Sequence, residues 1–238
     1  MSMYRLAGSI FLSVFLLGTF TACSGGSEPS EDAAAKSANV ATEKTTKPAM
    51  TGPSLLLSQA QFIYETRPDG KKVPKPGPAK LTILSFNGKT FESSVLEDEE
   101  SSVFHKTLCI NKPEEPAKLL TLGATSAHLK TWQQKGQTWT GRSHWKPTFG
   151  GKWDRLRDVE IGDVNGDGKD ELVIATHDQG VIAVATEKGD SWDIQEIYRE
   201  ANTFIHEIEI GDVNADGRLE FFSTPSKPNR ANSSQGGG

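Results

Sequence analysis

The sequence lacks the signatures that most often identify a nucleic-acid-binding protein or an enzyme. Its 31 acidic and 26 basic residues are mixed along the chain, so it has no basic stripe of the kind that binding to a phosphate backbone requires. It contains no Gly-Xaa-Ser-Xaa-Gly elbow, phosphate-binding loop, paired-cysteine zinc motif or His-Glu-Xaa-Xaa-His motif. We therefore expect no nucleic-acid partner, and the sequence does not favour an enzymatic activity.

Cysteine is nearly absent, because the 238 residues include only Cys23 and Cys109. In residues 1–22, Arg5 precedes an uncharged, mostly apolar run that ends in small residues, which is typical of a secretory signal peptide. The end of this run, "FTAC", resembles a bacterial lipobox. Cys23 is thus predicted to carry lipid and to tether an exported protein to the cell envelope, at the outer membrane if the host has one. Cys109 would then have no disulfide partner.

The alternative for the N-terminus is an uncleaved membrane anchor. The uncharged run at 6–22 is at the short end of the roughly 17 to 25 residues that a spanning helix needs, and glycine, serine and threonine dilute its hydrophobicity. Residues 23–52 lack aromatic residues and apolar periodicity, so they are predicted to be a flexible tether. Residues 226–238 are predicted to be a disordered tail or the end of a truncated chain.

An internal repeat organises residues 53–225. The segment "DRLRDVEIGD" at 154–163 aligns without gaps with "TFIHEIEIGD" at 203–212, and less closely with "SVFHKTLCIN" at 102–111. The copies therefore begin about 50 residues apart, a period that is typical of repeat architectures.

Each repeat reads as four short strands with no helical pattern between them. A glycine turn recurs in the last hairpin, as Asn-Gly at 87–88 and Lys-Gly at 135–136 and 188–189, where a positive φ costs glycine little. The predicted fold class is all-β, a β-propeller of about three and a half blades. The predicted blades are 53–100, 101–150, 151–200 and a partial blade at 201–225. The stretch 67–80, rich in proline and glycine, is predicted to be a loop.

Two acidic loops dominate the repeat. "GDVNGDGKDELV" and "GDVNADGRLEFF" place oxygen-bearing side chains at alternate positions, 49 residues apart. Side chains spaced in this way converge on one point when the loop coils around a hard cation such as Ca²⁺. The predicted ligands are Asp163, Asn165, Asp167, the Lys169 carbonyl and Glu171 in the first loop, and Asp212, Asn214, Asp216, the Arg218 carbonyl and Glu220 in the second.

Two other interpretations fit these loops less well. An EF-hand needs helices on both sides and a glutamate at the twelfth loop position, which here is Ile174 or Ser223. A simple Asp-Gly turn without metal would leave closely packed carboxylates that repel one another. Two Ca²⁺ sites with a mainly structural role are therefore predicted.

The acidic loops resemble those of the FG-GAP and VCBS repeat family, whose members form integrin-α-like propellers. The resemblance covers about residues 53–225 and implies calcium-binding blades in a secreted or surface protein. It leaves the activity open, because the family includes adhesive and carbohydrate-associated proteins and enzymes that carry the repeat as a module. A ring cannot close on three and a half blades, so a truncated chain or a completing partner is expected.

A recurring polar position supplies the candidate ligand site. The gap-free alignment places His105, Arg157 and His206 in one register of three inner strands, and His177 and Asp178 of "ATHDQG" could join them at the channel mouth. The favoured function is a surface module that binds a glycan or a protein partner. The alternative is an enzyme that acts on polysaccharides through this cluster, with histidine as acid or base. The simplest interpretation is that these residues bind no ligand and are polar only because the channel wall is exposed to water.

Overall fold

The computed structural model describes residues 52–112, 115–136, 138–150 and 154–227. The predicted signal peptide, Cys23, nearly all of the tether and most of the C-terminal tail lie outside these residues. Within them the structure contains strands and no α-helix, so no helix there is long and apolar enough to cross a membrane. The strands are β1 (Ser54–Gln59), β2 (Phe62–Thr66), β3 (Lys72–Pro76), β4 (Ala79–Phe86), β5 (Phe91–Asp98), β6 (Val103–Ile110), β7 (Lys118–Ala124), β8 (Leu129–Lys135), β9 (Thr138–Trp145), β10 (Leu156–Gly162), β11 (Glu171–Thr176), β12 (Val181–Lys188), β13 (Ser191–Arg199), β14 (Phe204–Gly211) and β15 (Glu220–Ser226).

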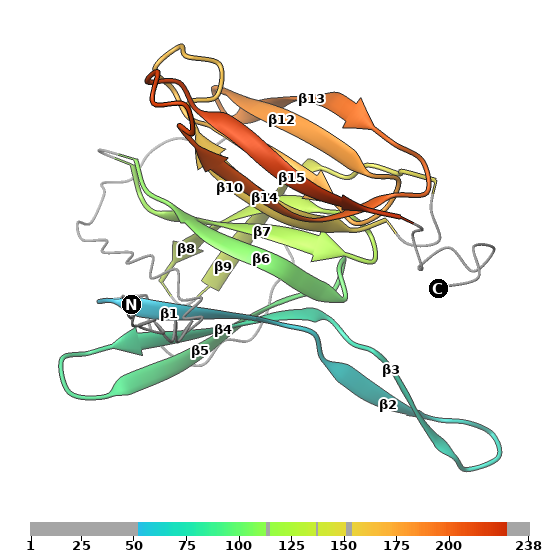
Figure 1. The fold of residues 1–238 in the computed structure, drawn as a ribbon. Helices are drawn as coiled ribbons and strands as arrows, with labels where there is room; N and C mark the ends of the chain where they lie inside the picture. The colour runs from blue at the N-terminus through green and yellow to red at the C-terminus, as the bar shows by residue number, and fades with distance from the viewer. Residues whose placement is uncertain (1–51, 113–114, 137, 151–153, 228–238) are drawn as a thin grey trace, which may run out of the picture.

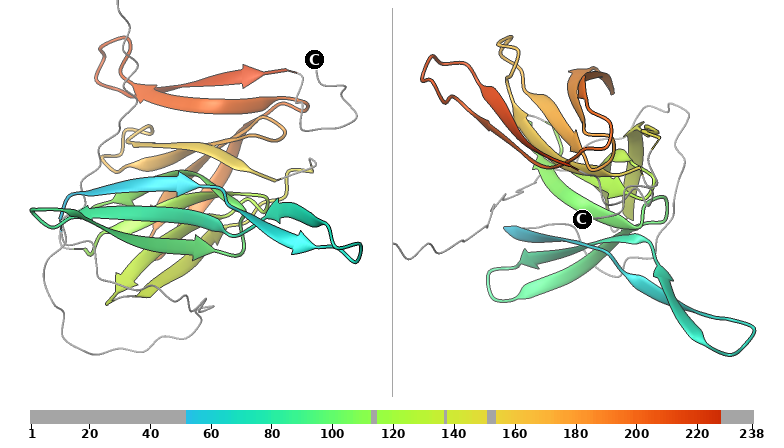
Figure 2. Two further views of the ribbon diagram at one scale, coloured as in Figure 1. Left: turned by 90° about the horizontal axis from the view of Figure 1, so that it is seen from below. Right: turned by 45° about the vertical axis from the view of Figure 1, so that its right-hand side comes forward.

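The strands form antiparallel sheets that follow the chain in order, as a propeller requires. Two sheets have four strands, β6-β7-β8-β9 and β10-β11-β12-β13. A three-stranded sheet, β1-β4-β5, precedes them, and a two-stranded sheet, β14-β15, follows. Neighbouring sheets lie side by side, and the described strands close into no barrel (Figures 1 and 2). The predicted all-β fold of propeller blades in an incomplete ring is confirmed.

The predicted hairpin turns are also confirmed. Gly88, Gly136 and Gly189 have φ values of 92°, 60° and 59°, and each lies between the last two strands of its sheet. Nothing lies within 4 Å of a Cβ built on any of the three, so backbone conformation, and not crowding, is the reason for glycine there.

The first sheet differs from the others by an inserted hairpin. Strands β2 and β3 pair only with each other and project from the body of the protein (Figures 1 and 2). The prediction of a loop at 67–80 is therefore wrong in part, because Lys72–Pro76 form β3 and β4 begins at Ala79. Prolines at 74 and 76 are tolerated because β3 is an edge strand of a two-stranded ribbon.

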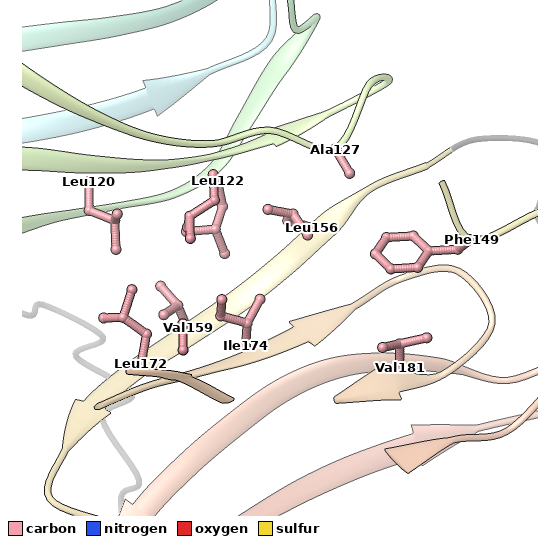
Figure 3. Packing of buried hydrophobic residues seen from close by; sticks show 11 residues of the cluster. Leu120, Leu122, Ala127, Phe149, Leu156, Val159, Leu172, Ile174 and Val181 are labelled. Carbon is pink, nitrogen blue, oxygen red and sulfur yellow. The ribbon is translucent and has the colours of Figure 1, made fainter. Parts of the chain in front are cut away.

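The hydrophobic core consists of three layers, each lying between two neighbouring sheets. One layer joins the first and second sheets through residues such as Leu81 and Leu119. A second joins β7 and β8 to β10, β11 and β12 (Figure 3), and a third joins β11 and β12 to β14. Along β11, Leu172 and Ile174 belong to the second layer, whereas Val173 and Ala175 belong to the third. This burial on both faces explains why the sequence of β11 is apolar without alternation.

Cys109 lies in the core layer between the first and second sheets and is 8% exposed. The expectation that it has no disulfide partner is wrong, because its sulfur is disulfide-bonded. The only other cysteine of the sequence is Cys23, which lies outside the described residues.

Candidate functional site

The first acidic loop connects β10 to β11 and folds around the carboxylate of Asp163. Its Oδ1 accepts hydrogen bonds from the backbone N–H of Gly166 (2.8 Å) and Asp167 (3.0 Å), and its Oδ2 accepts one from Gly168 (2.9 Å). Asn165 Oδ1 accepts from the Asp167 N–H at 2.8 Å. These bonds fix the turn, and Gly168 has a φ of 83°, a region that favours glycine.

The second acidic loop connects β14 to β15 and repeats this geometry. Asp212 accepts from the N–H of Asp216 (3.0 Å) and Gly217 (2.9 Å). The amide of Asn214 donates to Glu220 Oε1 at 3.0 Å, and the equivalent bond in the first loop, from Asn165 to Glu171 Oε1, is 2.8 Å. The two loops therefore present the same set of oxygen-bearing side chains in the same local fold.

Glu171 provides the test of whether the first loop fits a cation. The residue has no exposed surface, and its Oε2 is buried without a hydrogen-bond partner among the described residues. Burial, together with the charges of Asp167 and Asp163, raises the pKa of this carboxyl, although the backbone N–H groups of Asn165 and Val164 act in the opposite direction. A buried anion with an unsatisfied oxygen is costly, and a hard cation would offset that cost. The donor set is all oxygen and fits Ca²⁺.

The carboxylates of the loops are turned toward the backbone amides of their own turns. No group of three or more His, Cys, Asp or Glu side chains in the described part of the chain is arranged to hold a metal ion. Each predicted ligand set contains three carboxylates, so the three carboxylates of each loop do not converge on one point in this structure, and a bound ion would require them to turn inward.

The recurring polar position occupies an irregular point in each inner strand. The pairing register shifts between Phe104 and Lys106 in β6, between Leu156 and Asp158 in β10, and between Ile205 and Ile208 in β14. His105, Arg157 and His206 lie at these shifts. A β-bulge leaves its extra residue outside the ladder and re-aims its side chain, so one irregularity, repeated in three blades, presents the three polar groups.

Arg157, His206 and His177 lie together in space. Arg157 Nη2 is 3.2 Å from His206 Nδ1. The ring of His206 meets the ring of His177 edge-on, at a centroid distance of 5.6 Å. The His177 ring also stacks on Phe204 at 4.9 Å. His105 of β6 contacts the backbone of β10, where its Nδ1 is 2.6 Å from the Leu156 carbonyl.

Asp178 has a different environment from the other candidates. It is fully buried, and its two oxygens accept from Arg155 Nε at 3.0 Å and Arg155 Nη2 at 3.1 Å. The same Arg155 Nη2 is 2.6 Å from His177 Nδ1. Asp178 therefore positions Arg155, which in turn orients the His177 ring. We name His105, Arg155, Arg157, His177, Phe204 and His206 the inner-strand cluster.

The histidines of the inner-strand cluster are held in the neutral form. Burial first, and then neighbouring charges that include Arg157 and Arg155, lowers the pKa of His105 to about 4, although its bond to Leu156 acts in the opposite direction. Burial and then Arg155 lower the pKa of His177 to about 3. Burial and then Arg157 lower the pKa of His206. The cluster is thus electropositive through its arginines and not through its histidines.

Sequence reasoning missed Arg155 and Phe204. In the aligned repeats, Arg155 takes the place of Val103 and Phe204, so a charged residue at an otherwise apolar position was the available signal. Phe204 gave no signal, because an aromatic residue in a strand is ordinary.

Comparison with known proteins supports the repeat. Residues 163–223 match the family model described as FG-GAP-like repeat, a segment that runs from the first acidic loop through the second. No curated protein and no solved structure matches the chain.

Proposed function

We propose that this chain, which carries an FG-GAP-like repeat within a fold of propeller blades, is an exported, lipid-anchored binding module stabilised by calcium. Its partner is a glycan or a protein outside the cell. The observation that carries the calcium part of the proposal is the buried, unpartnered Oε2 of Glu171 beside a loop of oxygen ligands.

The calcium would act as a structural clamp. Asp163, Asn165, Asp167 and Glu171 would hold one ion with the Lys169 carbonyl, and the equivalent residues of the second loop would hold another. Each ion would join the end of one strand to the start of the next, β10 to β11 or β14 to β15. When bound it supplies positive charge that offsets the repulsion among the carboxylates.

Calorimetric titration with Ca²⁺ tests this part of the proposal. We expect two sites in the wild-type protein and one in each of Asp167→Ala and Asp216→Ala, which are exposed and so disturb the fold little. At free calcium about 100 times the dissociation constant, each site adds roughly 2.7 kcal/mol to the free energy of unfolding. Asp190→Ala is the matched control, since the Asp190 side chain is 93% exposed in a different turn. A melting temperature unaffected by a calcium chelator would contradict the proposal.

The lipid anchor is tested at Cys23. A lipid thioether and a disulfide with Cys109 exclude each other, because both consume the Cys23 sulfur, so the proposed anchor requires Cys109 to be a free thiol in the lipidated protein. Mass spectrometry of the protein purified from envelopes should find a lipidated N-terminal cysteine, and Cys23→Ala should release the protein from the membrane fraction. An unlipidated chain with Cys23 joined to Cys109 would contradict the anchor.

The histidines of the inner-strand cluster favour one alternative, an enzyme acting on polysaccharides. Neutral imidazoles beside arginines can take up a proton from a substrate. Turnover of uronic-acid polymers that is abolished in both His105→Ala and His206→Ala would support the enzyme; binding without turnover supports the module.

A further inference from the structure

Arg157 is the unpaired cation of the inner-strand cluster. It is half-buried, its hydrogen bond to His206 Nδ1 involves a neutral partner, and it forms no ion pair with any carboxylate of the described residues. Arg155, two residues earlier, is held by both oxygens of Asp178. A partly desolvated guanidinium without a counter-ion is unfavourable, and an external anion that accepts from its remaining N–H donors would offset this.

The histidine contacts fix which ring nitrogens carry the proton. A carbonyl only accepts, so His105 Nδ1, which faces the Leu156 carbonyl, carries the proton and Nε2 is an acceptor. A guanidinium only donates, so Nδ1 of His177 and of His206 is the acceptor toward Arg155 and Arg157. The Nε2–H groups of these two rings are therefore donors. The cluster combines one free cation with both donors and acceptors.

We infer that the inner-strand cluster binds a uronic acid residue of a glycan, with its carboxylate on Arg157 and its hydroxyls on the Nε2 atoms of His105 and His206. This inference rests on the proposed function as a binding module. A sugar acid carries one carboxylate among hydroxyls that both donate and accept, which matches the mixture of groups at the site. An acidic peptide side chain would need donors alone and would leave the His105 acceptor unused.

Titration of the full-length, calcium-loaded protein with trigalacturonate tests the inference. We expect saturable binding that shifts the Hε1 NMR signals of His105, His177 and His206. Arg157→Gln should weaken binding about tenfold or more, because a charge-assisted hydrogen bond contributes about 1.5–3 kcal/mol. Arg157→Lys should recover part of the affinity, since lysine keeps the charge and loses the planar fork.

Three controls make the result specific. Arg142→Gln should bind normally, because Arg142 is an exposed residue of β9, a different strand, near Asp190. The methyl-esterified trimer should bind poorly, since it lacks the carboxylate. Triglutamate tests whether the site binds the carboxylates of an acidic peptide instead of those of a sugar acid. Binding of triglutamate as tight as that of trigalacturonate, or equal binding to wild type and Arg157→Gln, would overturn the inference.

The result of the trigalacturonate titration can be distinguished from the result of the calcium experiment. If Ca²⁺ stabilises the protein and trigalacturonate does not bind, the inference is wrong and the calcium-stabilised module stands. If trigalacturonate binds through Arg157 and Ca²⁺ has no effect on melting, the glycan site stands and the calcium clamp is wrong.

Discussion

Two equivalent glutamates illustrate how one residue type behaves differently in two blades. Glu171 and Glu220 begin the strands that follow the two acidic loops. Glu220 is partly exposed, and its Oε2 accepts from the Val213 N–H at 3.0 Å. Glu171 is fully buried with an unpartnered oxygen. Burial makes the Glu171 carboxylate the more costly of the two without a metal ion and the more dependent on one.

Glu171→Gln should have opposite effects in the absence and presence of calcium. The raised pKa of Glu171 means that its charged form opposes folding at neutral pH, so we expect the variant to melt at the wild-type temperature or higher in chelator. With calcium in excess, its gain in stability should be about half that of the wild type, since one of two sites is lost. Thermal melts with and without calcium measure both effects.

Glu220→Gln is the matched variant for this prediction. It should lose a similar share of the calcium effect, and without calcium it should melt no higher than the wild type, because Glu220 is partly exposed. A Glu171→Gln protein that retains the full calcium gain would show that this carboxylate does not bind the ion.

At the scale of elements, the inner strands are joined by a polar link that the hydrophobic layers do not provide. Lys106 of β6 pairs with Asp158 of β10 at 2.8 Å and also with Glu160. Asp158 Oδ2 accepts from the backbone N–H of Ile208 in β14 at 2.9 Å. One buried carboxylate therefore connects three successive blades.

Asp158→Ala should be strongly destabilising. It leaves the buried Ile208 N–H unpaired and removes one partner of Lys106, so we expect a loss of about 2–4 kcal/mol in the free energy of unfolding. Glu160→Ala removes only the more exposed partner of Lys106 and should cost about 0–1 kcal/mol. Urea unfolding measures both variants. Equal losses for the two would show that Asp158 does not link the blades.

The elements also show what could be predicted from the sequence. The gap-free repeat and its glycine turns predict the strand order and the fold class. This works because the turn residues and the pairing of neighbouring strands depend on residues close together in the sequence. The β2–β3 hairpin is not predicted, because its prolines and glycines are typical of a loop. Its two strands also pair only with each other, so the repeat pattern gives no sign of them. The alignment identified the equivalence of His105, Arg157 and His206, but only three-dimensional packing reveals Arg155 on Asp178, since nothing local pairs them.

At the scale of the whole molecule, the packed sheets partly bury three histidine side chains in addition to the apolar core layers. His105 and His177 lie among the inner strands, and His144 of β9 lies at the outer side, where its Nε2 is 2.6 Å from Thr131 Oγ1. Burial, then Arg142 and Lys118, lowers the pKa of His144 to about 4. These three histidines are therefore neutral in the folded protein at pH values at which an unfolded chain is partly protonated.

The protein should lose stability as the pH falls from about 6.5 toward 4. In the unfolded chain these histidines bind protons near pH 6.5, whereas in the folded protein they do so only near pH 4 or 3. The unfolded state thus binds more protons across this window, so the free energy of unfolding is greatest above it and falls with pH. Urea midpoints at pH 7.5 and 5 should differ less in His144→Gln, which removes one histidine far from the inner-strand cluster. An identical pH dependence in this variant and the wild type would show that His144 makes no contribution to acid sensitivity.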